Sequence, residues 1–302
     1  MKLGSRPAGK QIAAASPQLT RTDAQGVRHP VVLVHGGGFT SQCYQQTAEG
    51  LPGWAPRLVD AGYEVYLLDW PGSDARPDLL TGNSLIEAMV EVLSEVPEPF
   101  ALLVHSMSGP YGYRLVERMR DAISALIAIA PGPPGNIQPH AALLAEDQRQ
   151  VTLEGPAGTW VVPKSGWWQP TQEFLDRKLI GDSTHCSAAA RLALGREAGP
   201  IPWRLLYERQ NVHGSQLVVH DTSAFVDLPA LVVTGDRDSD HSRETDAQVV
   251  EWLRRAGAAV RFSFLDDPPL TGNGHMLMSE DNSDDVLRHI THWLERTVTR
   301  QT

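Results

Sequence analysis

Short apolar, β-branched runs alternate along the chain with segments of helical periodicity. The runs are typical of buried strands, because parallel strands covered on both faces are apolar almost without interruption. The helical segments lie between them, which predicts β–α–β units and an α/β fold with a doubly wound, mostly parallel sheet. The predicted strands span residues 30–35, 63–69, 100–104, 123–130, 230–234 and 260–264, and the predicted helices span 85–93, 111–119, 246–255 and 286–298.

The alternation stops between residues 131 and 227. This segment is rich in proline, shows little strand alternation and holds Trp160, Trp167, Trp168 and Trp203. Because predicted sheet strands precede and follow it, we interpret it as a Trp-rich cap insertion of helices and loops. The domain prediction is therefore a polar N-terminal arm at 1–29, a core formed by 30–130 and 228–302, and a cap at 131–227.

Composition narrows the expected partners. The chain has 302 residues and a formal net charge of −10, and it contains no basic run, which argues against nucleic acid and anionic membranes. Cys43 and Cys186 lack the paired spacing of a zinc site and predict two buried thiols. The first 30 residues lack the apolar stretch of a secretory signal. We therefore expect a cytoplasmic protein, and the alternative is an exported protein whose signal has been trimmed. A homodimer remains open as its assembly.

One serine follows a predicted strand in a distinctive setting. Parallel sheets place their sites at the carboxyl ends of the strands, and the third predicted strand runs into His105-Ser106-Met107-Ser108-Gly109. A serine on a sharp strand-to-helix turn exposes its oxygen above the sheet. Ser106 is the favoured nucleophile, because Pro110 occupies the second position after Ser108. The alternative interpretation is that Ser106 only caps the following helix.

A serine hydroxyl is a weak nucleophile unless a base takes its proton. His275 lies in a glycine-rich turn between the last predicted strand and the last predicted helix, and we predict it as that base; other histidines, including His241, have no comparable context. A carboxylate must then orient the histidine. Asp238, just after the fifth predicted strand, is favoured, and Asp236 and Asp240 are its rivals.

A glycine run follows the first predicted strand, in His35-Gly36-Gly37-Gly38-Phe39. Acyl transfer builds negative charge on a carbonyl oxygen, which fixed backbone N–H groups must meet. We predict an oxyanion hole from the amide of Met107 and that of Gly37 or Gly38, because glycine lets the backbone approach a ligand closely. No metal or organic cofactor is expected. The predicted substrate-binding residues are Phe39, Tyr111, Trp160, Trp167, Trp168 and Met276.

With serine, acid and histidine in this chain order, residues 31–298 resemble the α/β-hydrolase superfamily. The segments 35–38, 69–72, 105–112 and 272–276 more narrowly resemble a subgroup of bacterial serine carboxylesterases. Two features depart from that subgroup. Residues 129–133 carry no glutamate where the subgroup can place its acid, and the subgroup's vicinal cysteine pair is missing. Val104 also stands where glycine is more usual in a nucleophile turn.

The resemblance implies hydrolysis of a carboxylic ester, or of a lactone, through an acyl-serine intermediate, with a small-molecule ester as the partner. A C–C bond hydrolase and a thioesterase use the same scaffold and remain alternatives. From another class, a non-catalytic ligand-binding protein can adopt the same fold. The sequence does not choose among esters.

Overall fold

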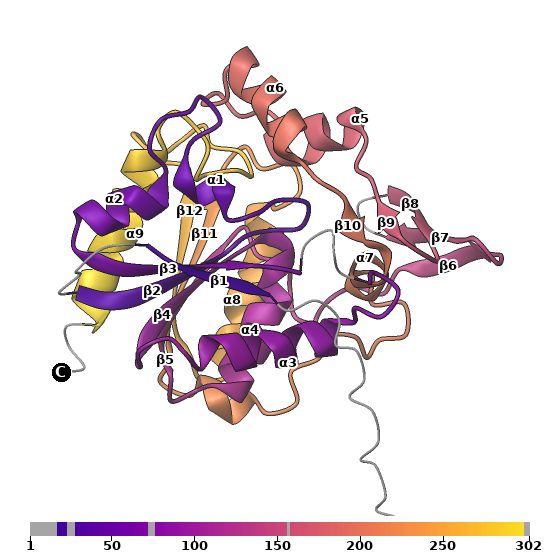
Figure 1. Cartoon of the computed structure of the whole chain (residues 1–302), viewed down its shortest axis with the longest axis horizontal. Coiled ribbons are helices and arrows are strands. Elements are labelled where there is room, and N and C mark those ends of the chain that lie inside the picture. Colours follow the sequence, from indigo (N-terminus) through magenta and orange to yellow (C-terminus); the bar gives the residue numbers. More distant parts are fainter. Residues whose placement is uncertain (1–16, 23–27, 72–75, 156–157, 299–302) are drawn as a thin grey trace, which may run out of the picture.

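A single large sheet forms the centre of the molecule (Figure 1). The computed structural model describes residues 17–22, 28–71, 76–155 and 158–298. Within these residues the sheet has seven strands in the order β1-β3-β2-β4-β5-β11-β12. The neighbouring pairs from β3 to β12 are parallel, and β1 is antiparallel to β3. The strands are β1 (Gln18–Arg21), β2 (Arg28–Val34), β3 (Tyr63–Asp69), β4 (Phe100–His105), β5 (Ile123–Ile129), β11 (Pro229–Gly235) and β12 (Ala259–Leu265).

The six predicted sheet strands are confirmed, with shifts of one or two residues at their ends. The N-terminal arm needs a correction. Gln18–Arg21 forms the edge strand β1, and the next strand begins at Arg28, so part of the predicted arm belongs to the sheet. The segment Gln18–Arg21 forms a strand because its backbone pairs with β3. Its polar sequence has no hydrophobic pattern that would predict this pairing. The predictions for residues 1–16 and 23–27 lie outside the described residues.

Alternate residues of each strand pack on opposite faces of the sheet. Val31 and Leu33 belong to the core under α2 (Trp54–Asp60) and α9 (Ser283–Val298). Val32 and Val34 belong to the core under α3 (Gly82–Leu93), α4 (Gly109–Arg118) and α8 (Arg243–Arg255). Helices thus cover both faces, which explains why the strands are apolar without interruption.

The observed helices begin earlier than the predicted ones, and in α3 and α8 the side-chain hydrogen bonds of polar caps fix the first turn. In α3 the Thr81 hydroxyl accepts from the backbone N–H of Ser84 at 3.0 Å, and the Ser84 hydroxyl accepts from that of Thr81 at 2.9 Å. At the start of α8, the Ser242 hydroxyl accepts from the backbone N–H of Thr245 at 3.2 Å. Such caps satisfy N–H groups without any apolar periodicity.

The insertion lies at one end of the sheet, where Figure 1 shows it as a separate group of elements. Its description as helices and loops was wrong in one respect, because it also contains two small antiparallel sheets, β6-β7-β8 and β9-β10. Strand β6 is exposed along its whole length, so no alternation marks it in the sequence. The strands are β6 (Ala142–Glu146), β7 (Gln150–Gly155), β8 (Gly158–Pro163), β9 (Trp167–Trp168) and β10 (Ile201–Pro202).

Short helices complete the insertion and the loops around the sheet. In the insertion they are α5 (Gln172–Leu175), η2 (Asp176–Ile180), α6 (Ala188–Glu197), α7 (Trp203–Arg209) and η3 (Thr222–Phe225). Elsewhere α1 (Gln42–Gln45) follows the glycine run, and η1 (Ser106–Ser108) leads into α4. No helix in the described part of the chain combines the length and the apolar character needed to cross a lipid bilayer.

Candidate active site

Ser106 occupies the sharp turn between β4 and the helices η1 and α4. Its backbone lies in the left-handed region, with φ of 52°, which costs a residue other than glycine on the order of 1–3 kcal/mol. The backbone N–H of Gly132 donates to the carbonyl oxygen of Ser106 at 2.8 Å and helps to hold the turn. The strained turn leaves Ser106 partly exposed between buried neighbours, as in a nucleophile elbow.

Two glycines after the serine let α4 approach the sheet. A Cβ atom on Gly109 would lie 2.5 Å from the carbonyl oxygen of Gly132, and one on Gly112 would lie 2.8 Å from Cγ1 of Val104. Both distances are shorter than real Cβ contacts. Gly112 of the helix therefore leaves room for the side chain of Val104. This explains why the strand position usually held by glycine can carry valine here.

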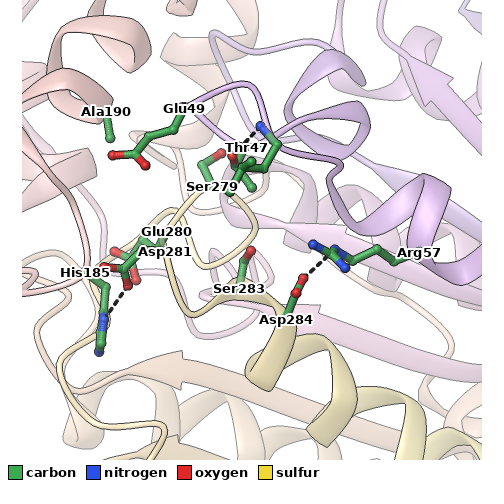
Figure 2. A pocket seen from close by; sticks show the side chains of 11 residues that line it. Thr47, Glu49, Arg57, His185, Ala190, Ser279, Glu280, Asp281, Ser283 and Asp284 are labelled. Atoms are coloured by element: carbon green, nitrogen blue, oxygen red, sulfur yellow. Dashed lines mark hydrogen bonds and ion pairs between the residues drawn. The ribbon is translucent and has the colours of Figure 1, made fainter.

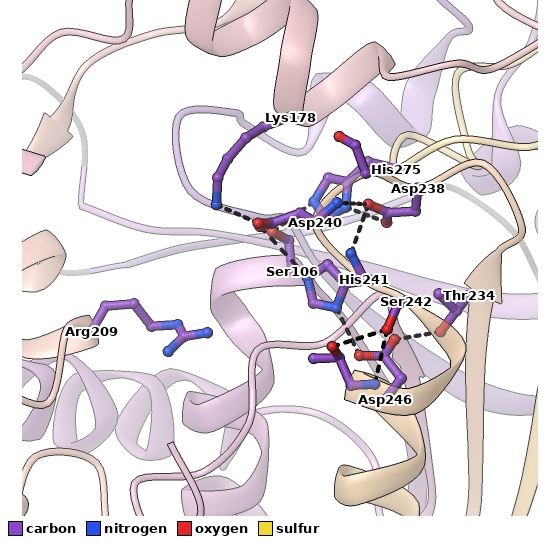
Figure 3. Close-up of polar contacts among 12 residues, drawn as sticks. Ser106, Lys178, Arg209, Thr234, Asp238, Asp240, His241, Ser242, Asp246 and His275 are labelled. Carbon is purple, nitrogen blue, oxygen red and sulfur yellow. Dashed lines mark hydrogen bonds and ion pairs between the residues drawn. The ribbon is translucent and has the colours of Figure 1, made fainter. Parts of the chain in front are cut away.

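Ser106, His275 and Asp238 form one hydrogen-bonded line (Figure 3). The Ser106 hydroxyl lies 2.8 Å from Nε2 of His275, and Nδ1 of His275 lies 2.7 Å from a carboxylate oxygen of Asp238. A carboxylate only accepts, so Nδ1 carries the proton and Nε2 is free to accept from the serine. Burial opposes ionisation of Asp238, but attraction to His275 and the hydrogen bonds it accepts outweigh burial and lower the pKa of Asp238.

The three candidate carboxylates of this loop have different partners. Asp238 contacts His275, and it also accepts from the backbone N–H groups of Asp240 and His241. Asp236 instead holds the loop that carries His275, accepting from the Thr271 hydroxyl at 2.9 Å and from the Gly272 N–H at 2.6 Å. Asp240 pairs with Lys178 at 2.6 Å. The geometry thus places Asp238, and neither rival, against the histidine.

His241 is a site residue that sequence reasoning missed. Its Nδ1 lies 2.8 Å from a carboxylate oxygen of Asp246, and the other oxygen of Asp246 accepts from the Thr234 hydroxyl. Burial disfavours a charged His241, but attraction to Asp246 outweighs it and raises the pKa of His241 to about 9. The sequence carried only a weak signal, the acidic Asp246 five residues later, because the full burial of its carboxylate in the first turn of α8 is visible in the structure alone.

The predicted oxyanion residues do not share one environment. Gly37 and Met107 both line the cavity beside Ser106, and a Cβ atom on Gly37 would lie 2.7 Å from Sδ of Met107. Gly38 does not line it. Its φ of 78° requires glycine, and its carbonyl oxygen accepts from the N–H of Gly199 in the insertion at 2.6 Å.

Buried hydrogen bonds fix the glycine loop next to the serine turn. The hydroxyl of Ser108 donates to the carbonyl oxygen of His35 and accepts from Nε1 of Trp70. On the ring of His35, Nδ1 donates to the carbonyl oxygen of Gly36 at 2.8 Å, and Nε2 accepts from the N–H of Trp70 at 3.1 Å. Ser108 is fully buried. It therefore ties the two loops together while Ser106 faces the cavity.

The cavity above Ser106 has a volume of about 360 Å³ and is covered by the insertion. Its wall combines apolar groups with a few charged ones. Of the predicted substrate-binding residues, Trp160 is the one that lines it. The lining also includes Gly37, Ser106, Met107, Gly132, Ile137, Phe174, Lys178, Leu179, Ile201, Leu206, Arg209, Asp240, His241 and His275.

The remaining five predictions of substrate contact need correction. Phe39, Tyr111 and Met276 are buried in the packing of the core and do not line the cavity. Trp168 packs behind the wall, with its ring 5.9 Å from Trp160. Trp167 pairs with Pro202 in the β9-β10 ladder, outside the lining. The order of residues in the sequence could not distinguish those that line the cavity from those that pack behind its wall.

A second, smaller pocket lies away from the serine, between the loop before α2, the start of α9 and the insertion (Figure 2). Its polar residues pair with one another: His185 with Asp281 at 2.5 Å, and Arg57 with Asp284. Within the residues that the structure describes, no group of three or more histidine, cysteine, aspartate or glutamate side chains could hold a metal ion.

Comparison with known proteins places the chain in a family. The model of the alpha/beta hydrolase family matches residues 31–289. The chain belongs to this family. A probable secreted lipase from a fungal species (strain ATCC 74256) is 23% identical over 342 residues, which cover 89% of this chain and 82% of the lipase.

Two further comparisons cover a part of the sequence and the fold. A pimeloyl-[acyl-carrier protein] methyl ester esterase from Legionella pneumophila is 32% identical over 111 residues, covering 37% of this chain and 41% of the esterase. Among solved structures, polyneuridine aldehyde esterase superposes with a TM-score of 0.57 at 18% identity, over 87% of this chain and 99% of that one. At this identity the likeness concerns the fold.

Proposed function

We propose that this alpha/beta hydrolase is a carboxylic ester hydrolase that works through an acyl-Ser106 intermediate. The observation that carries the proposal is the hydrogen-bonded line from Ser106 through His275 to Asp238. Its serine end has a strained backbone and lines a covered cavity. This line gives the serine hydroxyl a neutral base at hydrogen-bond distance, as nucleophilic catalysis requires.

The steps follow from these contacts. Ser106 Oγ attacks the ester carbonyl while Nε2 of His275 takes its proton, and Asp238 stabilises the imidazolium through Nδ1. The amides of Gly37 and Met107 hold the oxyanion of the tetrahedral intermediate. His275 then protonates the departing alkoxide, leaving the acyl group on Ser106. A water molecule, deprotonated by His275, releases the carboxylic acid and restores the serine.

Two relatives of the chain support an ester as the substrate. A lipase and a methyl ester esterase are both carboxylic ester hydrolases, and each aligns with this chain. The shape of the site supports the same class, because a cavity of about 360 Å³ with a largely apolar wall suits a small ester.

Purified protein tests the proposal. We expect it to hydrolyse 4-nitrophenyl esters of short and medium acyl chains and to be labelled by a fluorophosphonate at Ser106, located by peptide mass spectrometry. Ser106→Ala should lose both activities. Hydrolysis of matched thioesters or of a C–C bond in a β-diketone, without ester turnover, would contradict the proposal. If the purified protein shows no labelling and no turnover, the result would favour a ligand-binding protein.

A further inference from the structure

Arg209 is a charged residue of the cavity that the catalytic line does not use. It ends α7 and lines the cavity together with Ser106 and His275. Its Nη1 donates to the side-chain oxygen of Gln138. Its guanidinium lies against Gly132, where an added Cβ atom would be 2.7 Å from Nη2. The N–H of Gly132 holds the carbonyl oxygen of Ser106, so this positive charge lies beside the serine turn.

The other charged groups of the wall are paired. Lys178 lies 2.6 Å from Asp240, and His241 lies 2.8 Å from a carboxylate oxygen of Asp246. Among the described residues, Arg209 forms no ion pair, and its hydrogen-bond partner Gln138 is neutral. Figure 3 shows its side chain apart from the other charged groups, with the guanidinium directed toward the region of Ser106 and His241.

Arg209 is half-buried in this wall. Burial lowers the pKa of Arg209, because the charged form is less well solvated there than in water, and attraction to Asp240 opposes this shift. A guanidinium presents a planar fork of donors that matches a carboxylate in two parallel hydrogen bonds. Asp240 attracts Arg209 at longer range, but its carboxylate pairs directly with Lys178. An added anion would therefore meet a cation that has no ion-pair partner of its own among the described residues.

We propose that Arg209 binds a free carboxylate carried by the substrate, so that the preferred substrates are esters that also bear a carboxylate, such as half-esters of dicarboxylic acids. This inference rests on the proposed ester hydrolysis and names its substrate class. The carboxylate can belong to the acyl part or to the alcohol part of the ester, and the two arms of the experiment separate these sources.

The test uses two matched pairs of ligands that differ only in charge. For the acyl side these are monomethyl adipate and its neutral amide, methyl adipamate. For the alcohol side they are 6-acetoxyhexanoate and 6-acetoxyhexanamide. Calorimetric titration of the full chain carrying Ser106→Ala measures binding without turnover, and pH-stat assays of the wild-type protein measure kcat/KM for the same compounds.

We expect the charged member of at least one pair to bind about 10- to 100-fold more tightly, as a well-desolvated ion pair allows. Arg209→Gln should reduce that ratio at least 10-fold, and Arg209→Lys should restore part of it. Arg204→Gln is the matched control, because Arg204 lies on the same helix, is partly exposed and pairs with Glu208. It should keep the wild-type ratio.

Two results would overturn the proposal. One is equal affinity for the charged and neutral members of both pairs, and the other is a charge preference that survives Arg209→Gln. The binding arm separates this inference from the proposed function. Carboxylate binding that depends on Arg209, without ester turnover by the wild type, would uphold the subsite and reject the hydrolase.

Discussion

His241 lies stacked against His275, with ring centroids 5.2 Å apart and ring planes inclined by 28°. The first histidine is held by the buried carboxylate of Asp246, and the second is held by Asp238. Asp238, His241 and Asp246 come from the loop and helix that follow strand β11, whereas His275 comes from the loop between β12 and α9. Two histidine–carboxylate pairs therefore lie side by side, and only the one containing His275 reaches Ser106.

The His241–Asp246 pair should make stability depend on pH. Because the folded pKa of His241, about 9, is above its ordinary value of 6.5, its contribution is complete below pH 6.5 and is lost as pH rises through about 9. His241→Asn keeps a donor toward Asp246 but removes the charge. In urea titrations, the wild-type advantage over His241→Asn, on the order of a few kcal/mol at pH 6, should shrink steadily up to pH 9.5. A constant difference over this range would show that His241 is neutral.

Ser106→Ala should lower ester turnover by roughly 10⁴- to 10⁶-fold, because the members of a catalytic triad act as a unit. His275→Ala should lose a similar amount. Release of 4-nitrophenol measures both. The thermal midpoint of Ser106→Ala should equal or exceed that of the wild type, since alanine removes no packing contact of the core and leaves the backbone turn in place.

Ser108→Ala is the matched control for the nucleophile. It removes the hydroxyl that bridges the carbonyl of His35 and the indole N–H of Trp70, which should cost about 1–3 kcal/mol of stability. Turnover should persist. An inactive Ser108→Ala together with an active Ser106→Ala would move the nucleophile by two residues.

Asp238→Asn should lower kcat by up to about 10⁴-fold, because an amide favours the wrong tautomer of His275. Asp236→Asn should cost much less, since that carboxylate holds the backbone of Gly272 and the hydroxyl of Thr271. Its loss loosens the loop without touching the imidazole. Steady-state kinetics of the two variants with one ester decide the ranking, and a reversed order would make Asp236 the acid.

Gly112→Ala should destabilise the protein by about 1–3 kcal/mol, because the new methyl group would meet Val104 at 2.8 Å. Val104→Ala in the same chain should recover part of this loss by restoring space. Chemical denaturation of the single and double variants measures the coupling. Additive effects would mean that the helix and strand do not meet at these two residues.

The local pattern of the sequence determined the sheet and indicated the candidate catalytic residues. Apolar runs marked six strands to within one or two residues, because a strand buried on both faces has few polar positions to confuse the pattern. The edge strand β12 is the exception, since it alternates with polar residues and is partly exposed. The strand ends then indicated Ser106, His275 and three acidic candidates, since parallel strands end at one edge and bring their loops together. The exposed strand β6 and the polar edge strand β1 left no such pattern and were missed.

Tertiary structure decided whatever depended on distance between segments far apart in the chain. Asp236, Asp238 and Asp240 are equivalent by composition, and only the path of the loop directs Asp238 to His275 while Asp236 holds Gly272 and Asp240 meets Lys178. The same holds for the wall of the cavity. Arg209 reaches it because α7 of the insertion folds over Gly132, a contact between residues that no local periodicity connects.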